Sequence, residues 1–124
     1  MNGKRLNIAI VGGGLGGTLL ASHLAKDHHK ITLFENREDP RNHGFSGGRS
    51  INLAISKRGF TALKHINLDE KIKNKSLPMG GRMMHHPNKQ EAYQPYSLIN
   101  DECIYSISRS ILNIELINNA ERFK

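Results

Sequence analysis

"LNIAIVGGGLGG", residues 6–17, decides the fold of this chain. Its first six residues form a short apolar run rich in β-branched side chains, which is typical of a buried parallel strand. Gly12, Gly14 and Gly17 follow with the spacing G-x-G-x-x-G. Leucines then recur at near-helical intervals over residues 15–29. The stretch therefore predicts a strand, a tight turn and a helix in direct succession.

The expected turn gives each of these glycines a separate physical role. Gly12 lets the chain turn sharply, Gly14 lets the backbone approach a pyrophosphate, and Gly17 lets the helix pack closely on the strand. The N-terminus of the helix offers N–H groups and the positive end of its dipole to the phosphates. We interpret the turn as a dinucleotide-binding loop rather than a simple chain reversal.

A second strand ending in an acid supports this interpretation. "KITLFE", residues 30–35, ends at Glu35, eighteen residues past Gly17, where a carboxylate can accept hydrogen bonds from both ribose hydroxyls. The combination is much more specific than the glycines alone. It does not separate FAD from NAD.

Composition bounds the remaining function classes. The 124 residues suffice for one domain, and 37% hydrophobic with 23% charged residues is a globular balance. The net charge of +7 is spread along the chain without a nucleic-acid-binding motif, so we expect no nucleic-acid partner. A single cysteine excludes an internal disulfide, and no apolar run reaches membrane-spanning length. We expect a cytoplasmic protein with no membrane segment in this chain.

"MGGRMMHHP", residues 79–87, concentrates unusual chemistry in nine positions. A metal site is not expected, because adjacent His85 and His86 point to opposite sides of a strand. The segment predicts a strand that carries Arg82, a turn at residues 86–90 and a return strand that ends at Tyr96. A hairpin of this kind brings an arginine and a phenol together, as a carboxylate clamp or as an exposed arginine beside a packing tyrosine.

Residues 45–68, "FSGGRSINLAISKRGFTALKHINL", predict a glycine-containing loop, an apolar strand and a helix that Ser56 could cap. In structural terms this is a crossover segment of the sheet, with Phe60 and Leu63 facing the core. The segment resembles the kynurenine 3-monooxygenase family of flavoprotein aromatic hydroxylases, and "GRSINLA" is specific to that family. The later motifs "PM", "RM-H", "PY" and "SR" continue the resemblance to about Phe123 in the family's order.

The resemblance implies an α/β chain with a Rossmann-like FAD-binding βαβ fold and the start of a β-hairpin substrate-binding region, together an incomplete domain. It implies bound FAD, with NADPH as co-substrate. The residues that would contact FAD are Gly12, Gly14, Gly16, Gly17, Phe34, Glu35, Asn36, Arg37, Ala54 and Arg109. It also implies that Arg82 and Tyr96, fourteen residues apart, bind the substrate's carboxylate. No catalytic nucleophile or general base is implied, because the flavin carries the chemistry.

The implied reaction is hydroxylation of L-kynurenine to 3-hydroxykynurenine with NADPH and O2, a step of tryptophan degradation. The family's enzymes are much longer. We therefore expect residues 1–124 to be the N-terminal part of the FAD-binding domain, with residues 78–100 contributing to the substrate region. Alone, the chain should be inactive and prone to associate through uncovered apolar surface. The alternatives are another FAD-dependent aromatic hydroxylase and a non-catalytic nucleotide-binding remnant.

Overall fold

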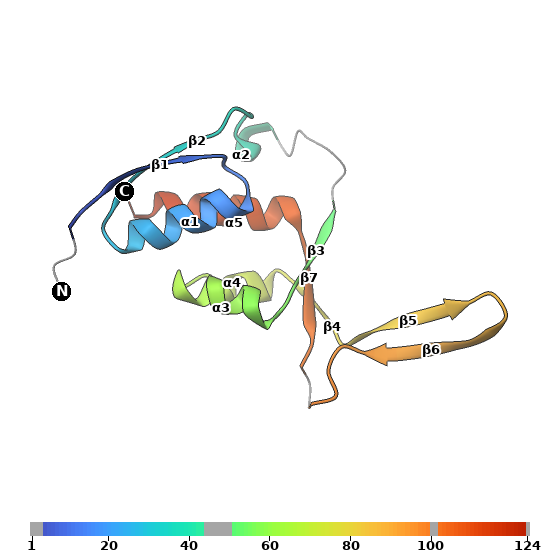
Figure 1. Cartoon of the computed structure of the whole chain (residues 1–124). Coiled ribbons are helices and arrows are strands. Elements are labelled where there is room, and N and C mark those ends of the chain that lie inside the picture. Colours follow the sequence, from blue (N-terminus) through green and yellow to red (C-terminus); the bar gives the residue numbers. More distant parts are fainter. Residues whose placement is uncertain (1–3, 44–50, 100–101, 124) are drawn as a thin grey trace.

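The computed structural model describes residues 4–43, 51–99 and 102–123, and it contains the predicted βαβ unit at its start (Figure 1). Strand β1 (Asn7–Val11) leads through the glycine turn into α1 (Leu15–Lys26), and β2 (Lys30–Phe34) returns parallel to β1. The pairing runs from Asn7 opposite Lys30 to Val11 opposite Phe34. The predicted order of strand, turn and helix is confirmed.

Two glycines of the turn are required by its geometry. Gly12 has a φ of 109°, a backbone conformation that residues with a Cβ rarely adopt. Its N–H donates to the carbonyl of Phe34 at 2.7 Å. A Cβ added to Gly17 would collide with the carbonyl oxygen of Gly12. The first turn of α1 therefore lies directly against the turn that precedes it, as the sequence predicts.

Strand β1 differs from the prediction of a fully buried strand. Its side chains alternate, with Ile8 half-buried and Ile10 buried, whereas Val11 is 88% exposed. Phe34, opposite Val11 on β2, is 54% exposed. Two strands covered by a helix on one side bury only one face, and the outward face carries exposed apolar side chains.

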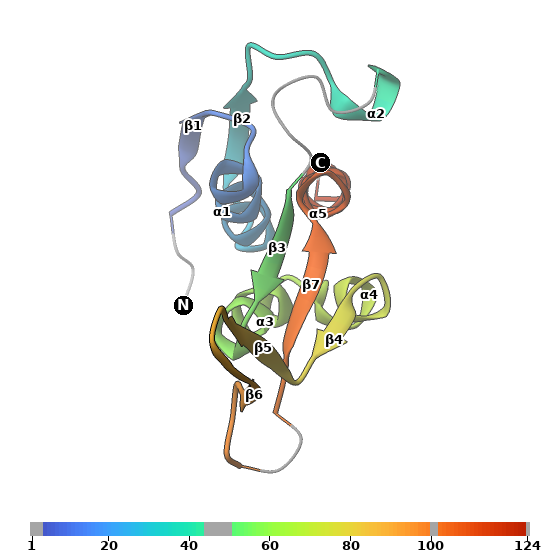
Figure 2. The ribbon, with the colours of Figure 1, turned by 90° about the vertical axis from the view of Figure 1, so that its right-hand side faces the viewer.

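The later elements include one three-stranded sheet (Figure 2). Strand β7 pairs antiparallel with both β3 and β4. The remaining elements are α2 (Pro40–His43), β3 (Asn52–Ile55), α3 (Lys57–His65), α4 (Asp69–Asn74), β4 (Leu77–Met79), β5 (Gly81–His86), β6 (Lys89–Pro95), β7 (Ile104–Ser108) and α5 (Arg109–Glu121).

The interpretation of residues 45–68 as a crossover of the parallel sheet is corrected by this topology. Residues 45–50 of that segment lie outside the described residues. Strand β3 does not join β1 and β2; it pairs with β7, with Asn52 opposite Ser108. A strand that comes more than fifty residues later supplies the partner, so the local pattern could not predict it. Ser56 is the N-cap residue of α3, but its side chain makes no cap hydrogen bond.

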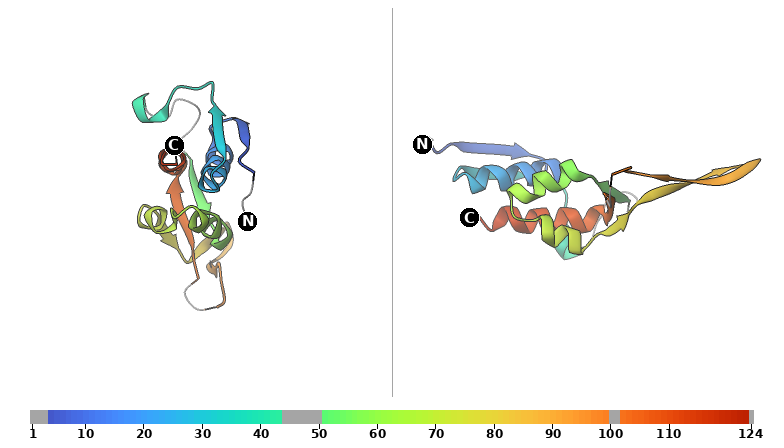
Figure 3. Two further views of the ribbon diagram at one scale, coloured as in Figure 1. Left: turned by 90° about the vertical axis from the view of Figure 1, so that its left-hand side faces the viewer. Right: turned by 90° about the horizontal axis from the view of Figure 1, so that it is seen from below.

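Helices α1 and α5 lie side by side, with β1 and β2 on one side and α3 and α4 on the other (Figures 1 and 3). Leu63 is buried in the core and Phe60 is half-buried against it, as predicted. A Cβ on Gly59 would lie 2.7 Å from Cγ2 of Ile55, so α3 packs closely against the end of β3 at this glycine. The core consists of Ile55, Leu63, Ile66, Leu68, Ile72, Ile107, Leu112 and Leu116.

The β5–β6 hairpin extends away from the rest of the molecule (Figures 1 and 3). Its turn is shorter than predicted, since only Pro87 and Asn88 separate the strands. The return strand accordingly begins at Lys89 and ends at Pro95, one residue before Tyr96. Among the described residues, no helix has the length and hydropathy that crossing a membrane requires.

The glycine contacts give a test of the fold. Gly17→Ala should lower the free energy of unfolding by about 3 kcal/mol, because its Cβ would meet the Gly12 carbonyl oxygen. Gly16→Ala is the matched control, because a Cβ there meets no atom of the described ranges within 4 Å, and it should raise the free energy of unfolding by about 0.5 kcal/mol. Urea unfolding followed by circular dichroism measures both. Equal effects of the two substitutions would contradict the close contact.

Candidate functional site

The N-terminus of α1 is open at the end of the β1–β2 sheet. Gly14 is the N-cap residue, and no side chain in the described part of the chain caps the helix. A Cβ placed on Gly14 or Gly16 would meet no described residue within 4 Å, so space lies in front of this backbone. Exposed N–H groups at a helix N-terminus bind anionic groups. The backbone therefore fits the pyrophosphate of a dinucleotide.

Glu35 lies beside the glycine turn, as predicted. One carboxylate oxygen, Oε2, accepts from the Gly13 N–H at 2.7 Å. Arg37 donates through its backbone N–H and Nε to Oε1, at 2.9 and 3.0 Å, and through Nη2 to Oε2 at 2.9 Å. These hydrogen bonds, led by those of the Arg37 side chain, lower the pKa of Glu35 to about 2.

The hydrogen bonds of Glu35 have a consequence for binding. An ionised carboxylate offers about four acceptor positions, and four donors now occupy them. Two ribose hydroxyls can bind Glu35 only when the Arg37 side chain moves away. Arg37 is exposed at the surface, so this movement costs little packing.

A cavity of about 210 Å³ lies next to Glu35, between the end of β2, the segment that includes α2, and α5. Arg41 spans it, pairing with Asp39 at 2.5 Å and with Glu121 at 2.7 Å. Both arginines of the wall, Arg37 and Arg41, are thus paired with carboxylates. With four acidic and two basic residues in its wall, the cavity suits a neutral, hydrogen-bonding group better than a phosphate.

The other residues predicted to contact the cofactor are spread around this end of the molecule. Phe34 is exposed at the end of β2, and Asn36, next to Glu35, is also exposed. Ala54 and Gly16 line one apolar cavity of about 370 Å³ formed by α1, β3, α3 and α5. Arg109 is exposed at the first position of α5, and its backbone N–H donates to the Ile51 carbonyl at 3.1 Å.

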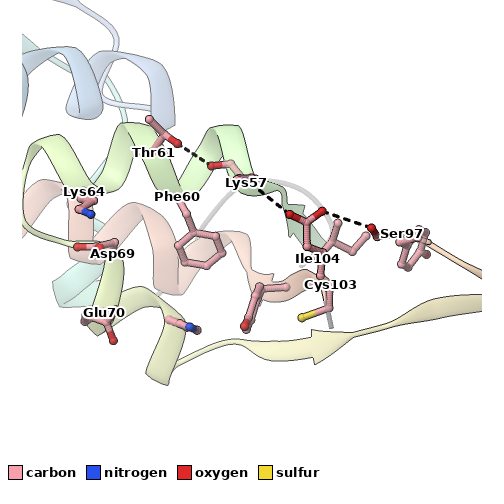
Figure 4. A pocket seen from close by; sticks show the side chains of 13 residues that line it. Lys57, Phe60, Thr61, Lys64, Asp69, Glu70, Ser97, Cys103 and Ile104 are labelled. Carbon is pink, nitrogen blue, oxygen red and sulfur yellow. Dashed lines mark hydrogen bonds and ion pairs between the residues drawn. The ribbon is translucent and has the colours of Figure 1, made fainter. Parts of the chain in front are cut away.

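The two residues predicted to bind the substrate are not opposite each other in the hairpin. Arg82 pairs with Gln94 across the strands, and its Nε donates to Gln94 Oε1 at 2.8 Å. Tyr96 lies two positions beyond Gln94 and lines a third cavity, of about 470 Å³. Figure 4 shows this cavity, with Phe60, Ser97 and Cys103 among its labelled lining residues. Arg82 is not among the residues that line that cavity.

The third cavity lies between α3, α4 and the segment that leads into β7. Lys57 and Glu102, which form an ion pair at 3.2 Å, both line it. Phe60 meets Tyr105 edge-on, with ring centroids 5.0 Å apart. A hydrogen bond with Cys103 raises the pKa of Tyr105. Within the described ranges, no cluster of three or more His, Cys, Asp or Glu side chains is placed to hold a metal ion.

Sequence reasoning missed Asn113, which lines the cavity beside Glu35 and is only 6% exposed. A signal was available, because the spacing of Leu112 and Leu116 predicts the buried face of α5 and Asn113 adjoins Leu112. A polar residue in that position is either paired or functional.

Comparison with known proteins agrees with the fold. Residues 10–64 match the family model described as an NAD(P)-binding Rossmann-like domain. The tetrameric form of 2-methyl-3-hydroxypyridine-5-carboxylic acid oxygenase superposes with a TM-score of 0.77 and 21% identity, over 98% of this chain and 30% of that one. The C294A mutant of the same oxygenase gives a TM-score of 0.78 at 17% identity. At this identity the likeness establishes the fold alone.

Several proteins found by sequence have a higher identity to this chain than those solved structures. Kynurenine 3-monooxygenase from Anopheles gambiae is 46% identical over 123 residues, or 99% of this chain. The enzyme of that name from Christiangramia forsetii is 48% identical over 118 residues, and the one from Sus scrofa is 42% identical over 120. The chain spans about a quarter of the length of these relatives, 25%, 26% and 25% respectively.

The pairing of Glu35 with Arg37 gives a titration test. Arg37→Ala should raise the pKa of Glu35 from about 2 toward its usual 4.5, because the Arg37 side chain is the largest cause of the shift. The carboxyl carbon shift in NMR measures this pKa. Arg41→Ala is the control and should leave Glu35 near 2, since Arg41 pairs with other acids. An unchanged pKa in Arg37→Ala would refute the pairing.

The same shift predicts how stability depends on pH. The pKa of Glu35 is lower in the folded chain than in the unfolded one, so its ionised form stabilises the fold. This contribution is complete above pH 4.5 and is lost as the pH falls toward 2. Arg37→Ala should reduce the loss over that interval.

Proposed function

We propose that this chain, which is related in sequence to the kynurenine 3-monooxygenases, is the FAD-binding N-terminal portion of such an enzyme. The observation that carries the proposal is the 46% identity over nearly the whole chain, combined with an open glycine turn beside Glu35. Residues 1–124 then form the N-terminal part of the FAD-binding domain, and residues 78–100 contribute to the substrate-binding region.

The site favours FAD over a nucleotide with a 2′-phosphate. A 2′-phosphate is normally bound by an arginine near the ribose. Arg37 and Arg41 line the cavity beside Glu35, but both are paired with carboxylates. Further acidic residues line the same cavity. The free 2′-hydroxyl of FAD can instead donate to Glu35 once Arg37 moves aside. NADPH, as co-substrate, would then bind elsewhere in the longer protein.

The residues of this chain would hold FAD in three places. The N–H groups at the start of α1, with Gly14 leaving room, would bind the pyrophosphate, and Glu35 would bind the adenosine ribose. Gly16 and Ala54, which share the apolar cavity, would lie along the cofactor, with Phe34, Asn36, Arg37 and Arg109 at its margins. The bound flavin, reduced by NADPH, would supply the oxygen chemistry.

The substrate we propose is L-kynurenine, after the name of the relatives. Arg82 has a planar guanidinium that can bind two carboxylate oxygens, and the Tyr96 hydroxyl can donate a further hydrogen bond. The Arg82 side chain is exposed, and among the described residues its hydrogen bond goes to a neutral amide, Gln94, so it can exchange that contact for a carboxylate. Holding the carboxylate would position the aromatic ring for hydroxylation. The 124 residues by themselves should not hydroxylate kynurenine.

Flavin binding by this chain is the direct test of the proposal. The purified chain should quench the fluorescence of added FAD, and Gly14→Val should weaken that binding at least about tenfold by filling the pyrophosphate position. The fold should tolerate the substitution, because a Cβ on Gly14 meets none of the residues that the structure describes within 4 Å. Thermal unfolding by circular dichroism provides the control. FAD affinity that persists in Gly14→Val would overturn the proposed site.

The substrate assignment is tested in the longer enzyme that carries this sequence as its N-terminal portion. Arg82→Ala should raise the KM for kynurenine by roughly 100-fold, the cost of a charge-assisted hydrogen bond of about 3 kcal/mol, and leave FAD content unchanged. Lys89→Ala, on the same hairpin beside the turn, is the matched control. If FAD and kynurenine binding fell together in Arg82→Ala, the clamp would be wrong. Full activity with another aromatic acid and none with kynurenine would favour a different hydroxylase.

A further inference from the structure

The β5–β6 hairpin pairs its arginine with an uncharged side chain. Arg82 and Gln94 lie directly opposite each other on neighbouring strands, and Arg82 Nε donates to Gln94 Oε1 at 2.8 Å. The side chains of Arg37 and Arg41 are instead paired with carboxylates, which cancel their charge. Gln94 therefore holds the guanidinium of Arg82 and leaves its positive charge available to a ligand.

This hydrogen bond uses one edge of the guanidinium only. Nε carries a single hydrogen, which is donated to Gln94, whereas Nη1 and Nη2 of Arg82 carry two each. Among the described residues, neither of these terminal nitrogens has a hydrogen-bond or ion-pair partner. A carboxylate that approaches them can form two parallel hydrogen bonds and leave the contact with Gln94 intact. Only an approach from the Nε side would require Arg82 to exchange that contact.

A hydrogen bond at Nε also orients the guanidinium. An exposed arginine side chain rotates about several bonds, and fixing it on a ligand costs conformational entropy. Because the N–H bond of Nε lies in the guanidinium plane, an acceptor at Gln94 sets the orientation of that plane. Arg82 and Gln94 come from adjacent antiparallel strands, so the backbone pairing of the hairpin fixes where the acceptor lies.

The same pairing places Tyr96 near Arg82 and Gln94. Tyr96 comes two residues after Gln94, and its backbone N–H donates to the Gly80 carbonyl at 2.9 Å. Arg82 and Tyr96 are therefore diagonal neighbours across the hairpin, a separation that long side chains can span. Gly80 has no side chain that could occupy the position opposite Tyr96. The hairpin thus brings a cation, its neutral acceptor and a phenol to one end.

We propose that Gln94 is a positioning residue, which orients the Arg82 guanidinium so that its two terminal nitrogens bind the substrate's carboxylate. The inference rests on the proposed function, because it requires that Arg82 bind a carboxylate. Glutamine suits the role because its side chain supplies an acceptor oxygen without a charge. A glutamate at this position would pair with Arg82 and repel the carboxylate of the ligand.

The test compares two substitutions of Gln94 in the longer enzyme that carries this sequence as its N-terminal portion. Gln94→Ala should raise the KM for kynurenine about fivefold, because the guanidinium is no longer held in place. Gln94→Glu should raise it at least about twentyfold, because the added charge competes for Arg82. Both variants should keep kcat and FAD content. A purely structural role predicts the reverse order, since glutamate has the shape of glutamine and alanine does not.

Gln90 provides the matched control on the same strand. It is exposed, lies four positions before Gln94, and forms no side-chain hydrogen bond with any described residue. Gln90→Ala and Gln90→Glu make the same chemical changes away from Arg82. They should leave the KM for kynurenine within about twofold of the unmodified enzyme.

The hydrogen bond itself is measurable in the 124-residue chain. Exchange of the Arg82 Nε–H with water, followed by heteronuclear NMR, should become at least about threefold faster in Gln94→Ala, because the hydrogen is no longer donated to an acceptor. Gln90→Ala should leave this rate unchanged. An equal exchange rate in Gln94→Ala and the unmodified chain would contradict the positioning contact.

A double variant separates this inference from the proposed function. In the Arg82→Ala background, Gln94→Ala should change the KM by less than about 1.5-fold, since Gln94 acts through Arg82. An unchanged KM in Gln94→Ala, equal effects in both backgrounds, or a milder effect of Gln94→Glu than of Gln94→Ala would overturn the role of Gln94 while the clamp stands. If Arg82→Ala leaves the KM unchanged, the clamp of the proposed function fails and this inference falls with it.

Discussion

The structure depends on the contact between the glycine turn and the end of β2. Two successive backbone N–H groups make it, Gly12 to the Phe34 carbonyl and Gly13 to the Glu35 carboxylate, each at 2.7 Å. The first holds β1 and β2 in parallel register, and the second brings the acid to the open N-terminus of α1. Because Gly17 lies against Gly12 with no room for a side chain, helix, turn and acid form one unit.

Helix α5 supplies the other wall of the cavity beside this unit. It packs along α1 and closes the cavity beside Glu35, and its Glu121 pairs with Arg41 of α2 at 2.7 Å. On another side, buried Glu115 pairs with Lys71 at 2.5 Å and Lys75 at 2.8 Å at the end of α4. The buried carboxylate of Glu115 is thus neutralised by two lysines that are themselves partly exposed. The candidate adenosine site is thus shared by elements from both ends of the chain.

Much of the fold could be predicted because its signals are local. The glycine spacing, the apolar strand and Glu35 lie within thirty residues, and each reports on backbone geometry at its own position. The errors arose where partners are distant or where register matters. Strand β3 pairs with β7 rather than with the parallel sheet. In the hairpin, a register shift between Met84 and His86 places Gln94 opposite Arg82. Nothing in a strand's own composition states which strand will pair with it.

By itself the sequence determined the βαβ unit, the openness of the α1 N-terminus and the position of Glu35, since glycine spacing and hydrophobic period directly constrain the backbone. Only the tertiary structure decided that Arg37 saturates Glu35, that Arg41 joins α2 to α5, and that Asn113 lies in the wall beside them. Those relations depend on how α5 packs against α1. This packing brings Asn113 to the same cavity as Glu35, nearly eighty positions earlier in the chain. A local sequence pattern cannot predict such a contact.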